Sequence, residues 1–323
     1  MFSLPDSYVW DFWFADDGDR YHLFFLYASK ALQDPDARHH RASVGHAVSG
    51  DLVGWKRVED ALVRSDAPAF DDLATWTGSV VRDDAGVWHM FYTGATLTAA
   101  GNVQSIGVAT SEDLLTWRKS PANPILRADA RWYETIADGH WHDEAFRDPF
   151  VYRQQDGTWR MLVTARAGHG QVDDRGVIAT ATSPDLVEWT LLPPLSQPGA
   201  GFGQLEVLNT ATVDGRSVLF FSCLAPELAS TRRETGSRGG VWAVVADRDG
   251  EWDPRQAHQV TGDDLYVGRV VVDRAGEPAF FAFRNAGPEG GFVGGITDPM
   301  PVRVIDGRVV AGERALDAVP VAR

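Results

Sequence analysis

Cysteine is nearly absent from this chain of 323 residues: Cys223, inside the apolar run VLFFSCLA, is the single one. An internal disulfide is therefore excluded, and we expect Cys223 to be a small buried side chain. The nine histidines are scattered, and no cysteine or histidine pair has the spacing of a zinc site. The sequence therefore predicts neither a structural metal nor a bound cofactor.

Positive charge and long apolar segments are also scarce. The formal net charge is −15 at pH 7, which argues against nucleic acid or an anionic membrane surface as a partner. No apolar run reaches the roughly 18 residues of a membrane span. The start MFSLPDSYVWD has neither the basic nor the apolar region of a signal peptide. We therefore expect a cytoplasmic protein whose partner is a small molecule.

Two β-rich elements recur along the chain. The first is an alternating strand followed by Ser-x-Asp-Leu and a tryptophan, at 44–55, 106–117 and 177–189. The second is a turn with Asp and Gly before an apolar strand; five such strands begin near residues 21, 88, 159, 217 and 278. Turns of this composition between β-rich runs are typical of hairpins. The repeating unit is built of strands and occurs five times, and no segment has a sustained helical period.

Five repeated sheets predict an all-β fold, a five-bladed β-propeller, because radial repetition protects the sheet edges. The whole of 1–323 is expected to form this single domain, since the fifth repeat uses up the chain. A sandwich of long hairpins is the alternative, and the regular period favours the propeller. In each repeat, the strand before the Asp/Gly turn is expected to be innermost and to line the central channel.

Three of these innermost strands carry an acid at a similar distance from the turn. Asp11 lies in VWDFWF, Asp148 in FRDPFVY and Glu206 in GQLEVLN. Propeller symmetry would bring all three to one mouth of the channel. A carboxylate among apolar and aromatic neighbours is costly unless it is used. Three acids at one offset favour a functional site over three unrelated strand-end turns.

Paired carboxylates are the usual machinery of glycoside hydrolysis, one as an ionised nucleophile or base and the other as a protonated acid. A third carboxylate would stabilise a cationic sugar ring or fix its hydroxyls. Tryptophans near the acids offer flat apolar faces for a sugar: Trp10, Trp13, Trp76 and Trp141. The tryptophans at 55, 117 and 189 repeat with the strands and are expected to pack in the core.

The motifs VWDFWF, WTGSVV, IGVATSEDLLTW and FRDPFVY resemble those of the five-bladed fructosyl-acting glycosidases, the invertase/levanase-like family 32 and the levansucrase-like family 68. FRDP matches the Arg-Asp-Pro motif of both families, and WTGS is similar to a Trp-Ser-Gly-Ser stretch in the second blade. VWDFWF is closer to the levansucrase-like nucleophile motif than to the Asn-Asp-Pro-Asn of invertases. The resemblance covers about residues 8–300.

This resemblance implies a role for each acid. Asp11 would be the nucleophile that forms a covalent fructosyl-enzyme, and Glu206 the general acid/base. Asp148 would hold fructose hydroxyls and stabilise the transition state, with Arg147 beside it. Such enzymes retain configuration, with the two carboxyl groups about 5–5.5 Å apart. The Val-Leu that follows Glu206 departs from the Glu-Cys-Pro of invertase-like enzymes, which leaves the surroundings of the acid/base open.

Several other residues are candidates for contact with a sugar. The substrate-binding candidates are Trp10, Trp76, Ser79, Arg147 and Tyr266. The polar loop with His39, His40 and Arg41 is expected near the leaving group, whereas a solvated loop explains His140 and His142 more simply. The polar segment 226–240 is expected to be a mobile rim or disordered. The C-terminal β-sandwich of family 32 is expected to be missing. The propeller flank that it would cover is then exposed, and we expect a homodimer to cover it.

The sequence therefore predicts a retaining glycoside hydrolase of the β-fructofuranosidase type. Its expected substrate is sucrose or a short fructan, with transfer of fructosyl units as a second outcome. Two alternatives stay open. One is an inverting glycosidase of the arabinofuranosidase or xylosidase kind, with carboxyl groups about 6.5–9.5 Å apart. The other is a sugar-binding propeller without turnover.

Overall fold

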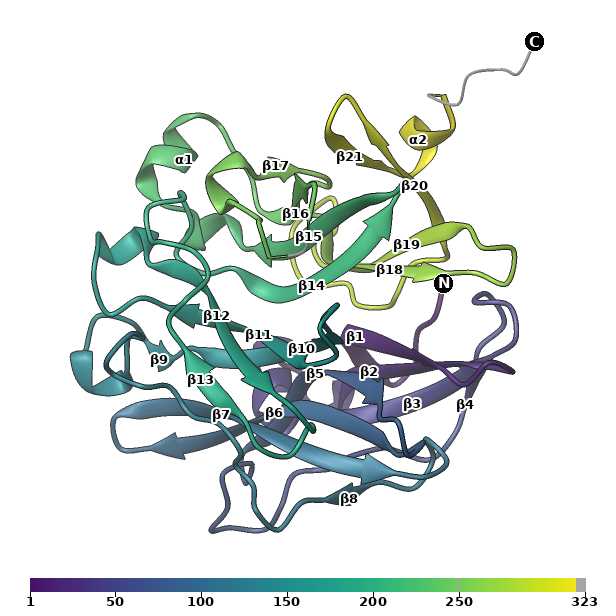
Figure 1. Cartoon of the computed structure of the whole chain (residues 1–323), viewed down its shortest axis with the longest axis horizontal. Coiled ribbons are helices and arrows are strands. Elements are labelled where there is room, and N and C mark those ends of the chain that lie inside the picture. Colours follow the sequence, from purple (N-terminus) through teal and green to yellow (C-terminus); the bar gives the residue numbers. More distant parts are fainter. Residues whose placement is uncertain (249, 318–323) are drawn as a thin grey trace.

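The computed structural model describes residues 1–248 and 250–317 and consists of five sheets arranged around a common axis (Figure 1). Within each sheet, successive strands of the chain are antiparallel neighbours. The repeats in the sequence predicted this five-bladed β-propeller, and the structure confirms it. The sandwich alternative is wrong.

The first three blades hold the first thirteen strands. From the axis outward these are β1 (Ser7–Asp16), β2 (Tyr21–Ser29), β3 (Ser43–Ser49) and β4 (Lys56–Arg57) in blade 1; β5 (Ala74–Arg82), β6 (Trp88–Thr98), β7 (Gly101–Ser111) and β8 (Arg118–Lys119) in blade 2; and β10 (Phe146–Arg153), β11 (Trp159–Arg166), β12 (Gly176–Ser183) and β13 (Thr190–Leu192) in blade 3. Another short strand, β9 (Asp143–Glu144), pairs in parallel with β7.

The last two blades complete the ring. They contain β14 (Glu206–Val213), β15 (Arg216–Cys223), β16 (Gly240–Ala246) and β17 (His258–Gln259) in blade 4, and β18 (Leu265–Val272), β19 (Pro278–Arg284), β20 (Met300–Ile305) and β21 (Arg308–Ala311) in blade 5. In Figure 1 the first strands of the blades gather near the centre, whereas the last strands lie at the periphery.

Short helical segments lie in the connections between strands and, in the case of α2, after the last strand. They are η1 (Lys30–Leu32), η2 (Asp36–Arg41), η3 (Ile136–Asp138), η4 (Val172–Asp174), η5 (Ala225–Glu227), η6 (Pro254–Gln256), α1 (Ser230–Glu234) and α2 (Glu313–Asp317). Across residues 1–248 and 250–317, no helix has the length and apolar character needed to cross a membrane.

The repeated Ser-x-Asp-Leu segments form the same tight turn after the third strand of blades 1 to 3. In blade 2, the Asp113 carboxylate accepts hydrogen bonds from the N–H groups of Leu115 and Thr116, at 2.9 and 2.8 Å. Leu114 adopts a φ of 62°, and its carbonyl accepts the indole N–H of Trp117 at 3.0 Å. Blades 1 and 3 repeat these contacts. The three tryptophans of these turns pack against the core, as expected.

Each inner strand contains a β-bulge at the same level of the propeller. The pairing with the second strand shifts immediately after Trp10, Trp76, Arg147, Glu206 and Tyr266. A bulge interrupts the alternation of side chains along a strand. Two consecutive residues can therefore face the axis at these five places.

The bulges correct the expected alignment of the three acids. Asp11 and Asp148 lie just after the point where the pairing shifts, whereas Glu206 lies just before it. Glu206 is thus equivalent to Arg147, not to Asp148. The expectation of one common offset was wrong because the hairpins differ in length: five residues separate the paired Arg153 and Trp159, whereas four separate the paired Thr212 and Ser217.

The N-terminal residues join blade 1 to blade 5. Phe2 and Ile296 exchange two backbone hydrogen bonds, at 2.9 and 2.8 Å. The Phe2 ring is buried and packs edge-on against Phe25, with 4.8 Å between the ring centroids. Figure 1 places the N-terminus beside β1 and β18. This pairing closes the ring and fixes the neighbouring strands that carry Asp11 and Tyr266.

Candidate active site

A pocket of about 260 Å³ opens at the axis, where the bulges of the inner strands meet. Consecutive residues from four bulges line it, with one residue from the fifth: Trp10 and Asp11, Trp76 and Thr77, Arg147 and Asp148, Glu206 and Val207, and Tyr266. The broken alternation of the bulged strands explains why neighbouring side chains share one cavity.

Asp11 on β1 is partly buried, and its Oδ2 accepts a hydrogen bond from the Thr77 hydroxyl on β5. Burial raises the pKa of Asp11 to about 7, assisted by the negative charge of Asp148. The Thr77 hydrogen bond and the Arg38 guanidinium act in the opposite direction. The Asp11 carboxyl therefore changes charge close to neutral pH, as is typical of catalytic groups.

Asp148 on β10 is only 4% exposed. Its Oδ2 accepts hydrogen bonds from the Thr164 hydroxyl at 3.0 Å and the Val207 N–H at 3.2 Å, which fix the carboxyl in place. Burial raises the pKa of Asp148 to about 6, although Arg147, with its Nε 3.5 Å from Oδ2, lowers it. Val207 makes this contact with a φ of 52°, a strained conformation for a β-branched residue.

Both oxygens of Glu206, at the start of β14, accept hydrogen bonds. Oε1 accepts one from Nη2 of Arg147 at 2.6 Å, and Oε2 accepts one from the Tyr266 hydroxyl at 2.5 Å. The same Nη2 donates to Oε1 of Gln204 at 2.5 Å. Burial and the charge of Glu206 raise the pKa of the Tyr266 phenol, so Tyr266 stays a donor. Arg147 and Tyr266 therefore hold Glu206 from two blades.

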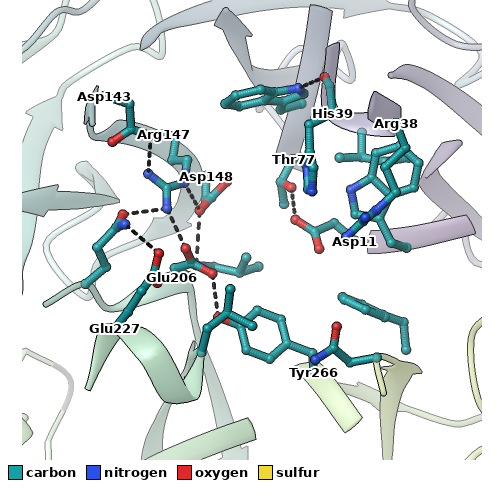
Figure 2. Close-up of a pocket in the computed structure, with 18 of the residues that line it drawn as sticks. Asp11, Arg38, His39, Thr77, Asp143, Arg147, Asp148, Glu206, Glu227 and Tyr266 are labelled. Carbon is teal, nitrogen blue, oxygen red and sulfur yellow. Dashed lines mark hydrogen bonds and ion pairs between the residues drawn. The ribbon is translucent and has the colours of Figure 1, made fainter. Parts of the chain in front are cut away.

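Figure 2 shows how these groups face one another. Asp11 and Thr77 lie on one side of the pocket, and Arg147, Asp148 and Glu206 lie on the other. The three acids and Arg147 that the sequence singled out are therefore brought together around one cavity. A ligand in this cavity would meet carboxyl groups from two sides.

Glu227, the last residue of η5, lines the pocket and was not identified from the sequence. The Gln204 amide donates a hydrogen bond to its Oε1 at 3.3 Å. Burial and the charge of Glu206 raise the pKa of Glu227 to about 8. Glu227 lies in the segment 226–240, which was expected to be a mobile rim or disordered and instead contains the end of η5 and all of α1. Because this loop is outside the repeated strands, the repeat pattern gave no signal for it.

Arg38 on η2 also lines the pocket and was missed. It is 8% exposed, and its guanidinium carbon lies 3.9 Å from the Phe292 ring centroid and 5.5 Å from that of Trp10. Its Nη1 donates to the carbonyl of Pro35 at 2.6 Å. The polar cluster His39, His40 and Arg41, which directly follows Arg38, was the signal in the sequence.

Of the histidines that the sequence placed in loops, two line the pocket and two do not. His39 lines the pocket, and its carbonyl accepts the indole N–H of Trp76 at 2.7 Å. Burial lowers the pKa of His39 to about 3, so its ring is neutral at physiological pH. His142 is exposed and lines the pocket mouth, whereas His140, His40 and Arg41 are not part of the lining.

Three other candidates do not join the pocket. Ser79 is 4% exposed, and its hydroxyl accepts the Val151 N–H at 3.0 Å, so it joins β5 to β10. Ser79 was a candidate as a residue of this inner strand, but the bulge presents Trp76 and Thr77 to the pocket instead. Trp13 is buried in the core. Trp141 lies against the Arg166 guanidinium, 3.7 Å from its ring centroid.

Carboxyl groups dominate the charge of the pocket. Among the described residues that line it, the acids are Asp11, Asp143, Asp148, Glu206 and Glu227. The guanidinium groups are those of Arg38 and Arg147. In the described ranges, no three His, Cys, Asp or Glu side chains are grouped so that they could hold a metal ion.

Comparisons with solved structures agree with the fold. An inulosucrase from Halalkalicoccus jeotgali bound to kestose superposes with a TM-score of 0.77 at 20% sequence identity, covering 97% of this chain and 89% of that one. A family 32 β-fructofuranosidase from Bombyx mori gives a TM-score of 0.71 at 18% identity, covering 97% and 66%. At these identities the likeness concerns the propeller fold.

Curated relatives are similar in sequence over part of their length. The chain is 28% identical over 277 residues to a sucrose-6-phosphate hydrolase of Bacillus subtilis (strain 168), covering 81% of this chain and 51% of that protein. It is 30% identical over 204 residues to an insoluble isoenzyme of β-fructofuranosidase from Arabidopsis thaliana, covering 61% and 34%. The chain thus spans about half or less of the length of these relatives.

The family itself is shown by a longer match. Residues 13–286 match the sequence model of the glycosyl hydrolases family 32 N-terminal domain. The match includes Asp148 and Glu206 and begins two residues after Asp11. The matched residues make up well over half of the chain and reach all five blades. The chain therefore belongs to glycosyl hydrolase family 32.

Proposed function

We propose that this protein is a retaining β-fructofuranosidase-type hydrolase that cleaves fructosyl linkages in sucrose or short fructans. The observation that carries the proposal is the convergence of Asp11, Asp148 and Glu206, from three blades, on one pocket. Family membership supports the reaction class. The names of relatives, which refer to sucrose-6-phosphate, to β-fructofuranosidase and to bound kestose, support a fructosyl substrate.

In the first step, the ionised Asp11 carboxylate attacks the anomeric carbon of the fructosyl unit. A bond forms between a carboxylate oxygen and that carbon, and the bond from the carbon to the leaving oxygen breaks. Glu206, on the opposite side of the pocket, gives its proton to the leaving oxygen. The product of this step is a fructosyl ester of Asp11, together with the released alcohol.

In the second step, a water molecule attacks the same carbon. The Glu206 carboxylate takes a proton from the water as the new carbon–oxygen bond forms and the ester bond to Asp11 breaks. Two inversions restore the starting configuration. A sugar hydroxyl in the place of water gives fructosyl transfer by the same sequence of bonds.

Asp148 is suited to hold sugar hydroxyls because its carboxyl is fixed at the base of the pocket by Thr164 and Val207. Arg147 ties Glu206 to this side of the site. Positioning of this kind reduces the entropy that must be lost in the transition state.

The pocket charge favours a neutral sugar over a phosphorylated one. Among the described residues, five acids line the pocket against two guanidinium groups, and even with Glu227 protonated, as its raised pKa of about 8 implies, more carboxyl than guanidinium groups would face a phosphate. The volume of about 260 Å³ lies just below the roughly 300–1,000 Å³ of typical small-molecule sites. Both features support one neutral fructosyl unit in the pocket, with the rest of the substrate at its mouth.

The test is release of fructose from sucrose, 1-kestose, an inulin oligosaccharide and sucrose-6-phosphate. The proposal expects turnover of a neutral fructoside, with kcat/KM for sucrose-6-phosphate at least about tenfold below that for sucrose. Asp11→Asn and Glu206→Gln should each lose about 10²–10⁴-fold in kcat/KM. Asp113→Asn, in an exposed turn outside the pocket, is the matched control and should keep wild-type activity. No turnover of any fructoside would contradict the proposal.

A further inference from the structure

Arg269 is a buried cation that the proposed reaction does not use. It lies on β18, where regular pairing with β19 resumes after the bulge, and it is 6% exposed. Its Nε donates to the carbonyl of Phe12 at 3.1 Å, and its Nη2 donates to the carbonyl of Gly78 at 3.4 Å. The guanidinium of blade 5 thus bonds to the inner strands of blades 1 and 2.

The positions of these two carbonyls connect Arg269 with Asp11. Phe12 directly follows Asp11, and Gly78 directly follows Thr77, the hydrogen-bond donor to Asp11. Both carbonyls therefore belong to the bulges that point Asp11 and Thr77 into the pocket. A rigid guanidinium that bonds to both bulges fixes their separation, and with it the Thr77–Asp11 hydrogen bond.

The charge of Arg269 is not neutralised by either of its hydrogen-bond partners. Its two hydrogen-bond partners are neutral carbonyls, and the negative groups whose fields act on it are Asp11 and Asp148. Burial lowers the pKa of Arg269 to about 10, so it is still a cation at neutral pH. In a partly desolvated site, such a charge favours ionised carboxyl groups nearby.

Other charges also act on Asp11 and must be considered with Arg269. The carboxyl groups of Asp148 on β10 and Glu206 on β14 raise the pKa of Asp11, and the Arg38 guanidinium on η2 lowers it. The Arg147 guanidinium on β10 is paired with Asp148 and Glu206.

We propose that Arg269 is a positioning residue for Asp11: it anchors the bulges of β1 and β5, and its fixed charge stabilises the ionised form of the Asp11 carboxyl. The kinetic consequence rests on the proposed function. The effect on the ionisation of Asp11 does not, because it requires no substrate.

The first experiment follows the ionisation of Asp11 directly, by NMR titration of ¹³C-labelled aspartate carboxyl groups, with the Asp11 signal assigned by its loss in Asp11→Asn. Arg269→Gln keeps a donor and removes the charge, whereas Arg269→Lys keeps the charge and removes the fork. The proposal expects the apparent pKa of Asp11 to rise by about one unit or more in Arg269→Gln. It expects a smaller rise in Arg269→Lys, which keeps the charge but loses the fork that fixes the Thr77–Asp11 hydrogen bond.

A matched control is Arg175→Gln. Arg175 is also buried and also donates to a carbonyl, that of Gly170 at 3.0 Å, but it lies in blade 3 beside Glu134. Loss of this arginine should lower stability without moving the titration of Asp11. The control separates the loss of a buried arginine in general from the loss of this one.

The second readout is the pH dependence of kcat/KM for the best fructoside. In Arg269→Gln, the acidic limb should move to higher pH with the Asp11 titration. The loss of kcat/KM relative to wild type should then be about tenfold greater at pH values below the limb than at the plateau. In Arg269→Lys, the limb should move in the same direction by a smaller amount. A purely structural role would lower stability in both variants and leave both limbs in place.

Two results would overturn the proposal: an Asp11 titration in Arg269→Gln that matches wild type, or equal shifts in the Gln and Lys variants. If Arg269→Gln does not fold, a shift of more than about one unit in Arg269→Lys is enough to reject it. If wild type cleaves no fructoside but Arg269→Gln moves the Asp11 signal, the proposed function fails and the role of Arg269 stands.

Discussion

Asp11 lies between Trp10 and Phe12, both buried, and its own carboxyl is drawn into a pocket that other acids share. Burial raises the pKa of Asp11 to about 7 and that of Asp148 to about 6. Because the two carboxyl groups interact, their titrations belong to the pair. The Asp11 and Asp148 carboxyl groups therefore ionise as pH rises through a range close to neutral.

The first prediction concerns the pH profile. A nucleophile must be ionised in the free enzyme, so kcat/KM should fall as pH decreases through the range of about 7 to about 6 given by these two pKa values. Initial rates at low substrate, measured from acidic to alkaline pH, give this limb. A kcat/KM that stays constant well below pH 6 would exclude Asp11 as the ionised group.

The second prediction concerns stability. The folded protein holds the Asp11 proton up to a pH of about 7, whereas the unfolded chain releases it near the ordinary value of 3.8. Wild type therefore loses stability as pH rises through this interval, and Asp11→Asn lacks this contribution while keeping those of Asp148 and Glu227. Relative to wild type, the variant should gain up to about 4 kcal/mol between pH 4 and pH 8. Urea unfolding at the two pH values measures the difference, and a constant difference would contradict the raised pKa.

The third prediction uses the fork of Arg147. Its Nη2 reaches both Gln204 and Glu206, and its Nε lies near Asp148. Lysine cannot reproduce these directions, so Arg147→Lys should lose about 10²-fold in kcat, with a smaller change in KM. Arg153→Lys is the matched control, because that arginine is on the same strand and pairs with Asp84 at the surface. Equal losses in the two variants would remove the special role of Arg147.

At this scale the sequence identified the acids better than their partners. Asp11 and Asp148 stand out because a carboxylate in an apolar strand is energetically costly unless it has a function. Thr77 and Glu227 do not stand out, since a threonine is ordinary in a strand and a glutamate is ordinary in a polar loop. Ser79 was a candidate because it lies on the inner strand of the second repeat, and the sequence gives no hint of the bulge that brings Thr77 into the pocket.

The strands themselves were predictable as elements, because alternating apolar residues and Asp/Gly turns mark both their faces and their ends. The bulges were not. In blades 3 to 5 the residue with positive φ is Asp148, Val207 or Val267, and none is the glycine that usually signals such a conformation. Contacts between blades impose these conformations, and a local pattern carries no record of them.

The fourth prediction tests the repeated turn. In blade 2, Asp113 accepts the N–H groups of Leu115 and Thr116. Asp113→Ala leaves both without this acceptor and should lower the free energy of unfolding by about 1 kcal/mol. Asp113→Asn keeps an oxygen at the same place and should stay close to wild type. Urea denaturation measures both variants, and equal stability of Asp113→Ala and wild type would show that water replaces the carboxylate without cost.

For the whole molecule, five strand repeats sufficed to predict the propeller and the meeting of Asp11, Asp148 and Glu206 around its axis. The way in which the ring closes was not predictable, because Phe2 and Ile296 belong to no repeat and meet only in the folded chain. Their pairing holds blade 5 against blade 1, so it also holds β18 and its Arg269 against β1 and Asp11.

The fifth prediction concerns this closure. Phe2→Ala removes a buried ring that packs on Phe25 and should lower the free energy of unfolding by about 3 kcal/mol. Val63→Ala, at a site that is 55% exposed, is the control and should change it by less than about 0.5 kcal/mol. Denaturant midpoints followed by tryptophan fluorescence compare the two. A loss no larger than the control's would mean that the closure contributes little.

The measurement that tests the central claim most directly is the configuration of the first fructose released from sucrose or 1-kestose. Proton and carbon NMR spectra recorded before mutarotation distinguish the two furanose anomers. Attack by Asp11 followed by attack of water predicts β-fructofuranose as the first product, absent with Asp11→Asn. Initial release of the α anomer would contradict a covalent intermediate on Asp11 and require direct attack by water.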